Sequence, residues 1–268
     1  MSTESKKTVI IGSGNVATHL AKILIKKGHE IVQFIGRNEI ALKDLSLKYL
    51  VSFTTDFTKL NTNADIYLIC VSDDEIEQVA KQLKLKDKLI LHTSGSVSLN
   101  SIQQISSKTG VLYPLQTISK DDKLKWSKIP VLIEGCTKEV EDEILQFAST
   151  ISKKITVLNS NQREKMHLAA VMVNNFSNHL STLANEFLEK EKAPYFKLLF
   201  PLMQQTIKKS KNLNPSLSQT GPAKRNDKKV ISKHLGLLKK HPEIAKIYSC
   251  ISESITNYHH GKLQGKTK

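Results

Sequence analysis

The sequence has few cysteines and no long apolar segment, and each shortage excludes a class of protein. The three cysteines, Cys70, Cys136 and Cys250, are odd in number and form no CxxC pair, which argues against a disulfide framework and a zinc site. No run approaches the roughly 18 apolar residues of a membrane span, and residues 1–7 lack the apolar core of a signal peptide. We therefore expect a soluble, cytoplasmic protein without a metal site.

Arginine is also scarce, which limits the functions that the positive charge of the chain can indicate. Lysine and arginine number 40 against 25 acidic residues, for a net charge of +15, but only Arg37, Arg163 and Arg225 are arginine. A basic protein attracts polyanions, yet bases are usually read by arginine and by aromatic residues, which make up only 6% of this chain. Because the lysines are spread along the chain, we interpret them mainly as a solvated surface that favours an anionic cofactor. A basic nucleic-acid-associated protein is the alternative.

The chain begins with an apolar strand that leads into a glycine turn. Residues 9–11 precede Gly12-Ser13-Gly14-Asn15-Val16-Ala17, and apolar residues at helical spacing follow until Gly28. Gly12 permits the sharp exit from the strand, Gly14 lets the backbone approach phosphate groups, and Ala17 lets the helix pack closely on the strand. The free N–H groups at the helix start then bind a dinucleotide pyrophosphate. A glycine turn in some other strand–helix unit is the alternative.

The residue that meets the adenosine ribose is expected about 20 residues after this turn, where the next strand, residues 31–35, ends. An acidic residue there would accept hydrogen bonds from the ribose hydroxyls, but this chain has Gly36-Arg37-Asn38. A guanidinium binds a phosphate through two hydrogen bonds, so Arg37 favours the 2′-phosphate of NADP(H) over NAD(H). A surface arginine at a helix start is the alternative interpretation.

Strands and helices alternate through the first half of the chain. Alternation of this kind builds a parallel sheet with helices on both faces, and we place this α/β domain at residues 1–159. Beyond the first two strands, the sequence predicts strands at 65–71, 88–92, 110–113, 130–134 and 155–158, and helices up to about residue 83, near 99–108 and at about 138–151.

After Asn159 the pattern changes to helices only. Residues 161–190 predict one long helix, a further helical stretch reaches Lys211, and a loop spans residues 212–226. Asp227 then caps a helix, and Pro242 lies in the first turn of the last one. Residues 160–268 are therefore predicted to form an all-helical domain.

The middle of the predicted long helix is uncharged. Residues 166–185 contain no Asp, Glu, Lys or Arg, so we expect this helix to be largely shielded from water. In projection the apolar residues share one side, and His167, Asn174, Asn178 and Asn185 lie on the opposite side. An uncharged polar stripe suits the lining of a cleft. The alternative is that these side chains are satisfied inside a helical or dimeric core.

Five segments of the chain together resemble a known family. They are residues 11–17, His92-Thr93-Ser94-Gly95-Ser96, Tyr113-Pro114-Leu115-Gln116-Thr117, His167-Leu168-Ala169-Ala170 with Asn174-Asn175-Phe176, and Gln219-Thr220-Gly221-Pro222-Ala223-Lys224-Arg225-Asn226-Asp227. The chain is similar over nearly its whole length to bacterial Rossmann-like proteins with a C-terminal domain of unknown function, which are often assigned as NADP oxidoreductases.

The resemblance implies an α/β fold in which an N-terminal Rossmann domain, a doubly wound parallel sheet, precedes an all-α domain. That domain resembles those of 6-phosphogluconate dehydrogenase and pyrroline-5-carboxylate reductase, which usually form dimers through the helical part. In such relatives a lysine, with an asparagine one turn later, often handles the substrate proton. This chain has His167 about where the lysine would be, and Asn174 and Asn175 follow two turns later. The departure argues against the usual hydroxyacid dehydrogenase activity.

Chemistry then assigns roles to the residues at the strand ends and on the long helix. Hydride transfer needs a proton donor and orienting groups beside the nicotinamide, at the carboxyl ends of the strands. We predict His167 as the proton donor, Asn175 and Ser94 as further catalytic residues, and His92 as a core histidine. Predicted coenzyme contacts are residues 12–17, Arg37, Val71, Ser72, Ser94 and Gly95, and predicted substrate contacts are Ser96, Gln116, Asn174, Thr220 and Arg225.

The main hypothesis is therefore an NADPH-dependent oxidoreductase that reduces a small, anionic carbonyl or imine compound in a cleft between the two domains. A non-enzymatic NADP-binding sensor or scaffold is the first alternative, and the basic nucleic-acid-associated protein is the second. The loop at residues 219–227 completes a site either in its own subunit or in that of a partner.

Overall fold

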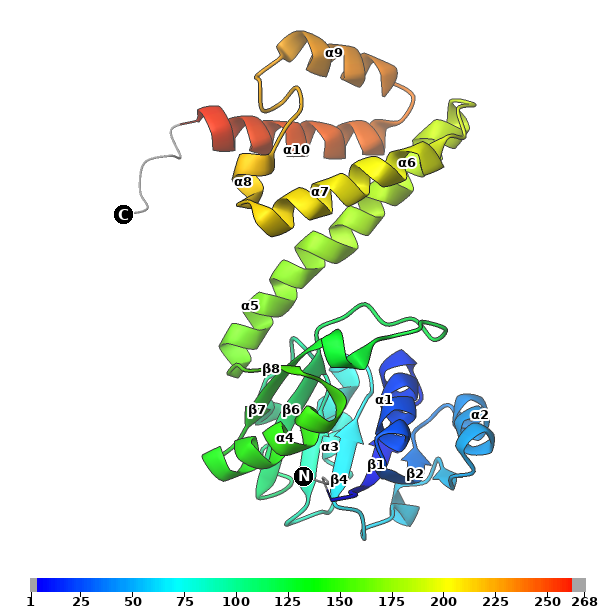
Figure 1. Ribbon diagram of the computed structural model, residues 1–268. Helices are drawn as coiled ribbons and strands as arrows, with labels where there is room; N and C mark the ends of the chain where they lie inside the picture. The colour runs from blue at the N-terminus through cyan, green and yellow to red at the C-terminus, as the bar shows by residue number, and fades with distance from the viewer. Residues whose placement is uncertain (1–3, 262–268) are drawn as a thin grey trace. The chain divides into compact units, whose positions relative to one another are not determined.

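The computed structural model describes residues 4–261, which form two compact units that divide between Asn175 and Phe176 (Figure 1). The change from alternating elements to helices falls at residue 160, where α5 (Ser160–Ala170) begins, but α5 belongs with the first unit. Within residues 4–261, every helix is too short or too polar to cross a lipid bilayer.

The first unit is built on one eight-stranded sheet in the order β3-β2-β1-β4-β5-β6-β7-β8. The strand order runs in opposite directions from β1 and from β4, so the switch point of a doubly wound sheet lies between them, as predicted. Neighbouring strands are parallel except β6 and β7, which are antiparallel. The strands are β1 Lys7–Ile11, β2 Glu30–Ile35, β3 Phe53–Thr54, β4 Ile66–Ile69, β5 Leu89–His92, β6 Lys108–Pro114, β7 Pro130–Gly135 and β8 Lys154–Val157.

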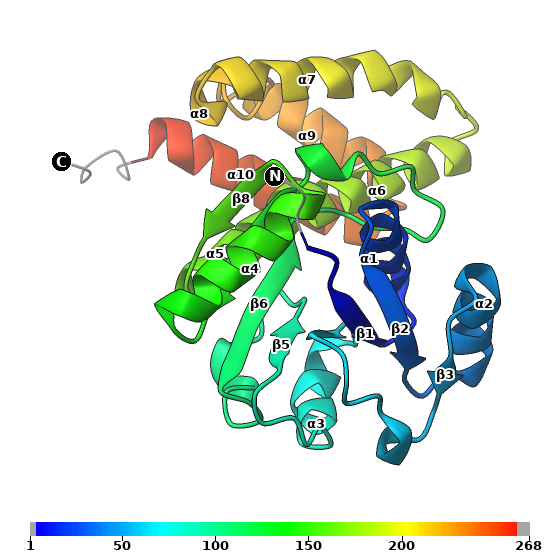
Figure 2. The ribbon, with the colours of Figure 1, turned by 60° about the horizontal axis from the view of Figure 1, so that its bottom comes forward.

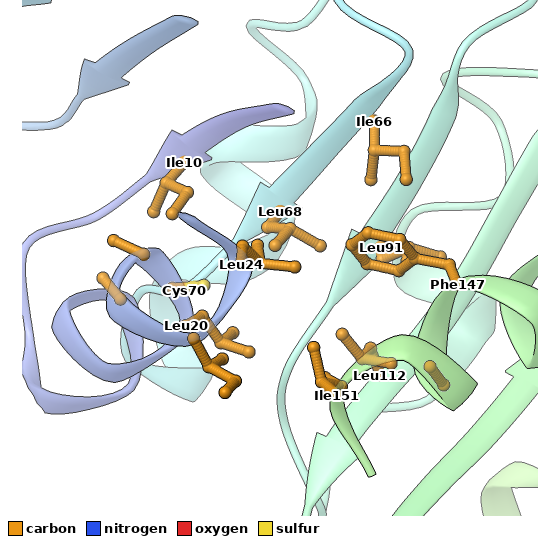
Figure 3. Packing of buried hydrophobic residues seen from close by; sticks show 14 of the residues in the cluster. Ile10, Leu20, Leu24, Ile66, Leu68, Cys70, Leu91, Leu112, Phe147 and Ile151 are labelled. Atoms are coloured by element: carbon orange, nitrogen blue, oxygen red, sulfur yellow. The ribbon is translucent and has the colours of Figure 1, made fainter. Parts of the chain in front are cut away.

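Helices cover both faces of this sheet because successive strand residues point to opposite sides (Figures 1 and 2). On one face Ile10 and Leu68 pack with α1 (Asn15–Lys26), α2 (Glu39–Tyr49) and α4 (Lys138–Ile151), and Figure 3 shows Leu20 and Leu24 of α1 near Leu68. On the other face Ile11 and Ile69 pack with α3 (Ile76–Ala80) and the 3-10 turn at Leu99–Ser101. The α/β architecture predicted from the alternation is confirmed.

The prediction of a helix near residues 99–108 is wrong. Only the turn at Leu99–Ser101 forms, and β6 already begins at Lys108. Polar side chains of this segment bond to the backbone instead, which competes with a helix. The Ser98 side chain accepts from the Asn100 N–H, and the Ser106 hydroxyl donates to the carbonyls of Lys86 and Lys88.

The long helix predicted at 161–190 is present with one irregularity. Asn159 and Gln162 form a capping box at its start, and α5 then leads through a π-helical turn, Val171–Phe176, into α6 (Ser177–Lys190). A π turn holds an extra residue and is frequent at functional sites. Here it contains Asn174 and Asn175.

The second unit is all-helical, and its side chains are largely exposed. Among residues 176–261 the buried ones are Ala223, Leu238, His241 and Ser252. The expected shielding of the uncharged helix is therefore absent in the single chain, where Phe176 is 56% exposed. Besides α6, its helices are α7 Phe200–Asn212, α8 Pro215–Ser218, α9 Lys228–Leu237, which Asp227 caps as predicted, and α10 Pro242–His260.

Candidate coenzyme site and active site

The glycine turn after β1, residues 12–14, leaves part of its backbone accessible to solvent. Gly12 has a φ of +119°, and a Cβ there would lie 2.3 Å from the carbonyl oxygen of Cys70, so no other residue fits. A Cβ at Gly14 would meet nothing within 4 Å. Gly14 precedes α1, whose first turn carries no acidic residue and no side-chain cap. The N–H groups of that turn are free for an anionic group, as a pyrophosphate requires.

A cavity of about 260 Å³ lies against this turn. Its lining includes many of the predicted coenzyme residues, namely Gly12, Ser13, Gly14, Arg37, Val71 and Ser72, and it adds Glu75. The remaining residues of the motif have other tasks. Ala17 is fully buried where α1 packs on the sheet, and the Asn15 side-chain amide donates to the carbonyl of Ile118.

Arg37 lies at the edge of this cavity and forms an ion pair with Glu75. The Arg37 side chain is 74% exposed and that of Glu75 is 20% exposed. The second carboxylate oxygen of Glu75 accepts a 2.6 Å hydrogen bond from the Ser72 hydroxyl. Arg37, the predicted contact of the 2′-phosphate, thus lines this cavity together with a carboxylate that was not predicted as part of the site.

The turn after β5 brings the next group of predicted residues to the carboxyl edge. The buried Ser94 hydroxyl oxygen accepts from the N–H groups of Ser96 and Val97, at 3.1 and 3.0 Å. Ser94 thus holds the shape of the turn. The Ser96 hydroxyl donates to the carboxylate of Asp73, which follows β4. Gly95 lies between the two serines and is buried.

Gly95 supports a pair of polar rings. The Tyr113 Oη and His167 Nδ1 atoms are 3.0 Å apart, and the rings meet edge to face with 5.8 Å between centroids. A Cβ at Gly95 would lie 2.6 Å from His167 Nδ1 and 2.7 Å from Tyr113 Cζ. The pair therefore packs directly on the backbone at the end of β5. Only a glycine leaves room for it there.

Burial raises the pKa of the Tyr113 phenol, and the negative charge of Asp73 raises it further. Tyr113 consequently keeps its proton at neutral pH. Its hydroxyl and the half-buried His167 ring share one hydrogen bond. Together they form a hydrogen-bonded pair at the carboxyl edge of the sheet.

His167 is aimed at this edge because α5 is anchored one turn earlier. The fully buried Arg163 forms an ion pair with Glu134 and donates a 2.5 Å hydrogen bond to the carbonyl of Val97. The hydroxyl of Ser160 donates to Glu134 as well, at 2.8 Å. Residues four apart share a helix face, so the anchor at Arg163 turns His167 toward the sheet.

A second cavity, of about 630 Å³, extends from the Tyr113–His167 pair along α5. Gln116, Asn174 and Asn175 line it, so three predicted residues meet here. The amide of Asn174 donates to the Thr117 hydroxyl at 2.5 Å. The rest of the lining is uncharged, consisting of Leu115, Ile118, Met166, Ala169, Ala170, Val171 and Val173.

His92 is a core residue, as predicted, but only one of its two ring nitrogens has a hydrogen-bond partner among the described residues. Its Nδ1 accepts from the N–H of Ser94 at 3.2 Å, and its buried Nε2 has no hydrogen-bond partner among the described residues. Burial lowers the pKa of His92 to about 3, and the nearby charge of Arg163 contributes to the shift. His92 is therefore neutral at physiological pH.

Two predicted substrate residues, Thr220 and Arg225, belong to the second unit. Both are exposed, and Thr220 lines an apolar groove of about 600 Å³ in that unit. Neither contributes to the cavities of the first unit.

Sequence reasoning missed three residues of the site, Tyr113, Asp73 and Glu75. Tyr113 stands in one of the five family-like segments and ends a strand, which was a usable signal. Asp73 and Glu75 directly follow β4, where ligand-facing residues are expected, but the segment Ser72-Asp73-Asp74 also has the composition of a helix start.

Two family descriptions match the chain. Residues 7–95 match NADP oxidoreductase, coenzyme F420-dependent, and residues 129–255 match a domain of unknown function, DUF2520. The first match spans the glycine turn, Arg37 and the turn after β5. The second begins just before β7 and covers the long helix and most of the second unit.

Among solved structures, the chain is similar to a provisionally assigned NADP oxidoreductase from Bacteroides fragilis. The two are 37% identical, the match covers 94% of this chain and 98% of that one, and the TM-score is 0.88. An imine reductase from Myxococcus stipitatus in complex with NADP⁺ is 15% identical, with 96% of each chain covered and a TM-score of 0.64, which reflects a shared fold.

A shorter match links the chain to glycerol-3-phosphate dehydrogenase [NAD(P)+] of Staphylococcus aureus. The two are 28% identical over an alignment of 116 residues, and the match covers 37% of this chain. The chain spans about a third, 35%, of the length of these curated relatives.

Proposed function

Because the chain belongs to the same family as the Bacteroides fragilis NADP oxidoreductase, we propose that it is an NADPH-dependent reductase of a small, anionic carbonyl or imine compound. The observation that carries this proposal is the position of the Tyr113–His167 pair. A hydrogen-bonded pair at the carboxyl end of β5 lies where a doubly wound sheet presents the reactive end of a dinucleotide.

NADP(H) is the cofactor of this family, and the first unit has the features that it needs. Gly12, Gly14 and the N–H groups of α1 would hold the pyrophosphate, and Arg37 would bind the 2′-phosphate. The bound nicotinamide supplies or accepts a hydride. The residues of the protein have to orient the substrate and move the accompanying proton.

We assign the proton transfer to His167 and Tyr113. When a carbonyl or imine carbon gains a hydride, its oxygen or nitrogen gains a proton. The His167 side chain donates that proton, and the Tyr113 hydroxyl orients the ring through the hydrogen bond at Nδ1. The raised pKa of Tyr113 keeps its hydroxyl protonated during this step. Ser94 is a positioning residue in this scheme, because its hydroxyl shapes the turn that carries Gly95.

The cavity along α5 is our proposed substrate site. Gln116, Asn174 and Asn175 offer amide donors and acceptors in an otherwise apolar lining, which suits a small compound with one or two polar groups. Ser96 lies at the same edge through its bond to Asp73. Arg225 and Thr220 lie outside this cavity, in the second unit, and they are our candidates for binding an anionic substrate group from the loop at residues 219–227, of the same subunit or of a partner.

We also propose that the protein is a homodimer in which a second copy covers the apolar groove of the second unit. Leu180, Leu183, Phe187, Ile247 and Ile251 line that groove together with few polar groups. Among the apolar residues at 176–261 only Ala223 and Leu238 are buried, and a large exposed apolar patch usually marks an interaction site. The three free cysteines support a reducing compartment such as the cytoplasm.

The test follows NADPH oxidation by the whole 268-residue chain over a panel of keto acids, aldehydes and cyclic imines. With the best substrate, Tyr113→Phe and His167→Gln should each lower kcat about 100-fold, the size usual for loss of an acid catalyst. The KM for NADPH should stay within about twofold, since neither residue lines the coenzyme cavity. His179→Gln, an exposed histidine of α6, is the matched control and should leave kcat unchanged.

The outcomes separate the proposed enzyme from its alternative. An unchanged kcat in both variants would remove the pair from the mechanism. NADPH binding without turnover of any compound would instead favour a nucleotide-binding sensor or scaffold, and no binding of either pyridine coenzyme would overturn the cofactor site itself.

A further inference from the structure

The ion pair between Arg37 and Glu75 crosses the coenzyme cavity. Arg37 follows β2, Glu75 follows β4, and these two strands flank β1 on either side in the sheet. The pair therefore bridges the carboxyl end of β1, where the glycine turn lies, and both side chains line the same cavity as Gly12 and Gly14. A dinucleotide bound to that turn has to meet both side chains.

The two side chains favour different coenzymes. A 2′-phosphate pairs with a guanidinium and is repelled by a carboxylate, whereas a free ribose 2′-hydroxyl donates to a carboxylate. Gly36, Arg37 and Asn38 at the end of β2 include no acidic residue, but Glu75 brings a carboxylate to the same cavity from the segment after β4. Its two oxygens are held by Ser72 and Arg37, so the carboxylate is fixed in place.

We propose that Glu75 is a specificity-determining residue that competes with the coenzyme 2′-phosphate for Arg37 and accepts the ribose hydroxyls of NAD(H). This inference rests on the proposed function, because it concerns the same coenzyme site. It means that the protein discriminates between NADPH and NADH less strongly than Arg37 alone would dictate. It also means that NADPH binding breaks the Arg37–Glu75 pair.

The experiment measures the dissociation constants of NADPH and NADH by fluorescence titration for the wild type, Glu75→Gln and Glu77→Gln. Glutamine keeps the size of Glu75 and an oxygen for Ser72 but removes the charge. Freeing Arg37 and removing the repulsion should tighten NADPH binding about tenfold. Loss of the charged acceptor should weaken NADH binding about tenfold, so the ratio of the two constants should shift about 100-fold.

Glu77→Gln is the matched control. Glu77 lies two residues further on, pairs with Lys81 and is absent from the cavity lining, so both dissociation constants should stay within about twofold of the wild type. Arg37→Ala should move the preference the opposite way, toward NADH. The inference is overturned if Glu75→Gln behaves like Glu77→Gln, or if it weakens NADPH binding. In either case the wild type still binds NADPH, which leaves the proposed function standing, whereas a wild type that binds neither coenzyme refutes both.

Discussion

The two units of this chain differ in how much of their own apolar surface they bury. The first unit has two continuous clusters of buried residues, one on each face of its sheet. The second unit buries only Ala223 and Leu238 among its described apolar residues, and Leu198, Leu202 and Ile207 are each at least 65% exposed. The first unit therefore has its own core, while the second leaves most of its apolar side chains exposed in the single chain.

Charged residues are also distributed unequally between the two units. Residues 176–268 contain 17 lysines and arginines against six acidic residues, so the part with little core also holds most of the net positive charge of the chain, +11 of +15. Like charges repel across an interface, and salt screens that repulsion. If a second copy covers the groove, the association should strengthen as salt is raised.

The largest effect that separates the two units is expected from truncating one leucine in each. Leu24 in α1 is fully buried, so Leu24→Ala should lower the free energy of unfolding by about 2–5 kcal/mol. Leu202→Ala in α7, where the side chain is 65% exposed, should cost under about 1 kcal/mol. Urea unfolding followed by fluorescence of Trp126, the single tryptophan and a residue of the first unit, reports the first change, and circular dichroism reports the second. An equal loss in the free energy of unfolding for both variants would mean that the difference in burial between the two units does not affect stability.

The next effect concerns association. Ile251→Glu puts a carboxylate in the apolar groove of the second unit, and burying an unpaired charge is costly. The dimer dissociation constant should rise at least about 100-fold in sedimentation experiments, equivalent to roughly 3 kcal/mol. Leu47→Glu, at a 66% exposed leucine of α2, is the control and should not change it. A variant that still dimerises would show that the groove is not the interface, and a wild type that stays monomeric would refute the dimer.

The fold was predictable where local rules determine it. The apolar strand before Gly12, the cap at Asp227 and the start of the long helix at Asn159 each depend on residues within a few positions of one another. The expected helix near 99–108 failed for a local reason too, because Ser98 and Ser106 bond to the backbone.

The contacts of the candidate site were less predictable, because they join distant segments. Tyr113 and His167 are 54 residues apart, and Glu134 and Arg163 are 29 apart. Their pairing depends on how α5 lies against β6, which carries Tyr113, and β7, which carries Glu134, and no periodicity in the sequence specifies this. The sequence indicated that His167 matters, but its partner came only with the tertiary structure.

The smallest of these effects is a pH dependence that belongs to the first unit. His92 is buried with a pKa lowered to about 3, against an ordinary value near 6.5, so as the pH falls the unfolded chain takes up a proton that the folded chain does not. The stability from keeping His92 neutral is complete above about pH 6.5 and is lost progressively toward pH 3. Lowering the pH from 7 to 5 should therefore reduce the free energy of unfolding by about 2 kcal/mol through His92 alone. His92→Asn keeps an acceptor for the Ser94 N–H but does not titrate.

Urea unfolding of the wild type and of His92→Asn at pH 7 and pH 5, followed by Trp126 fluorescence, measures this difference. Between pH 7 and pH 5 the free energy of unfolding of the variant should fall by about 2 kcal/mol less than that of the wild type. His29, whose pKa burial also lowers, is unchanged in both proteins and cancels. His241→Asn is the control, because it removes a histidine of the second unit, whereas Trp126 reports the unfolding of the first. An equal acid loss in the wild type and His92→Asn would mean that His92 gains a proton in the folded state as readily as in the unfolded chain.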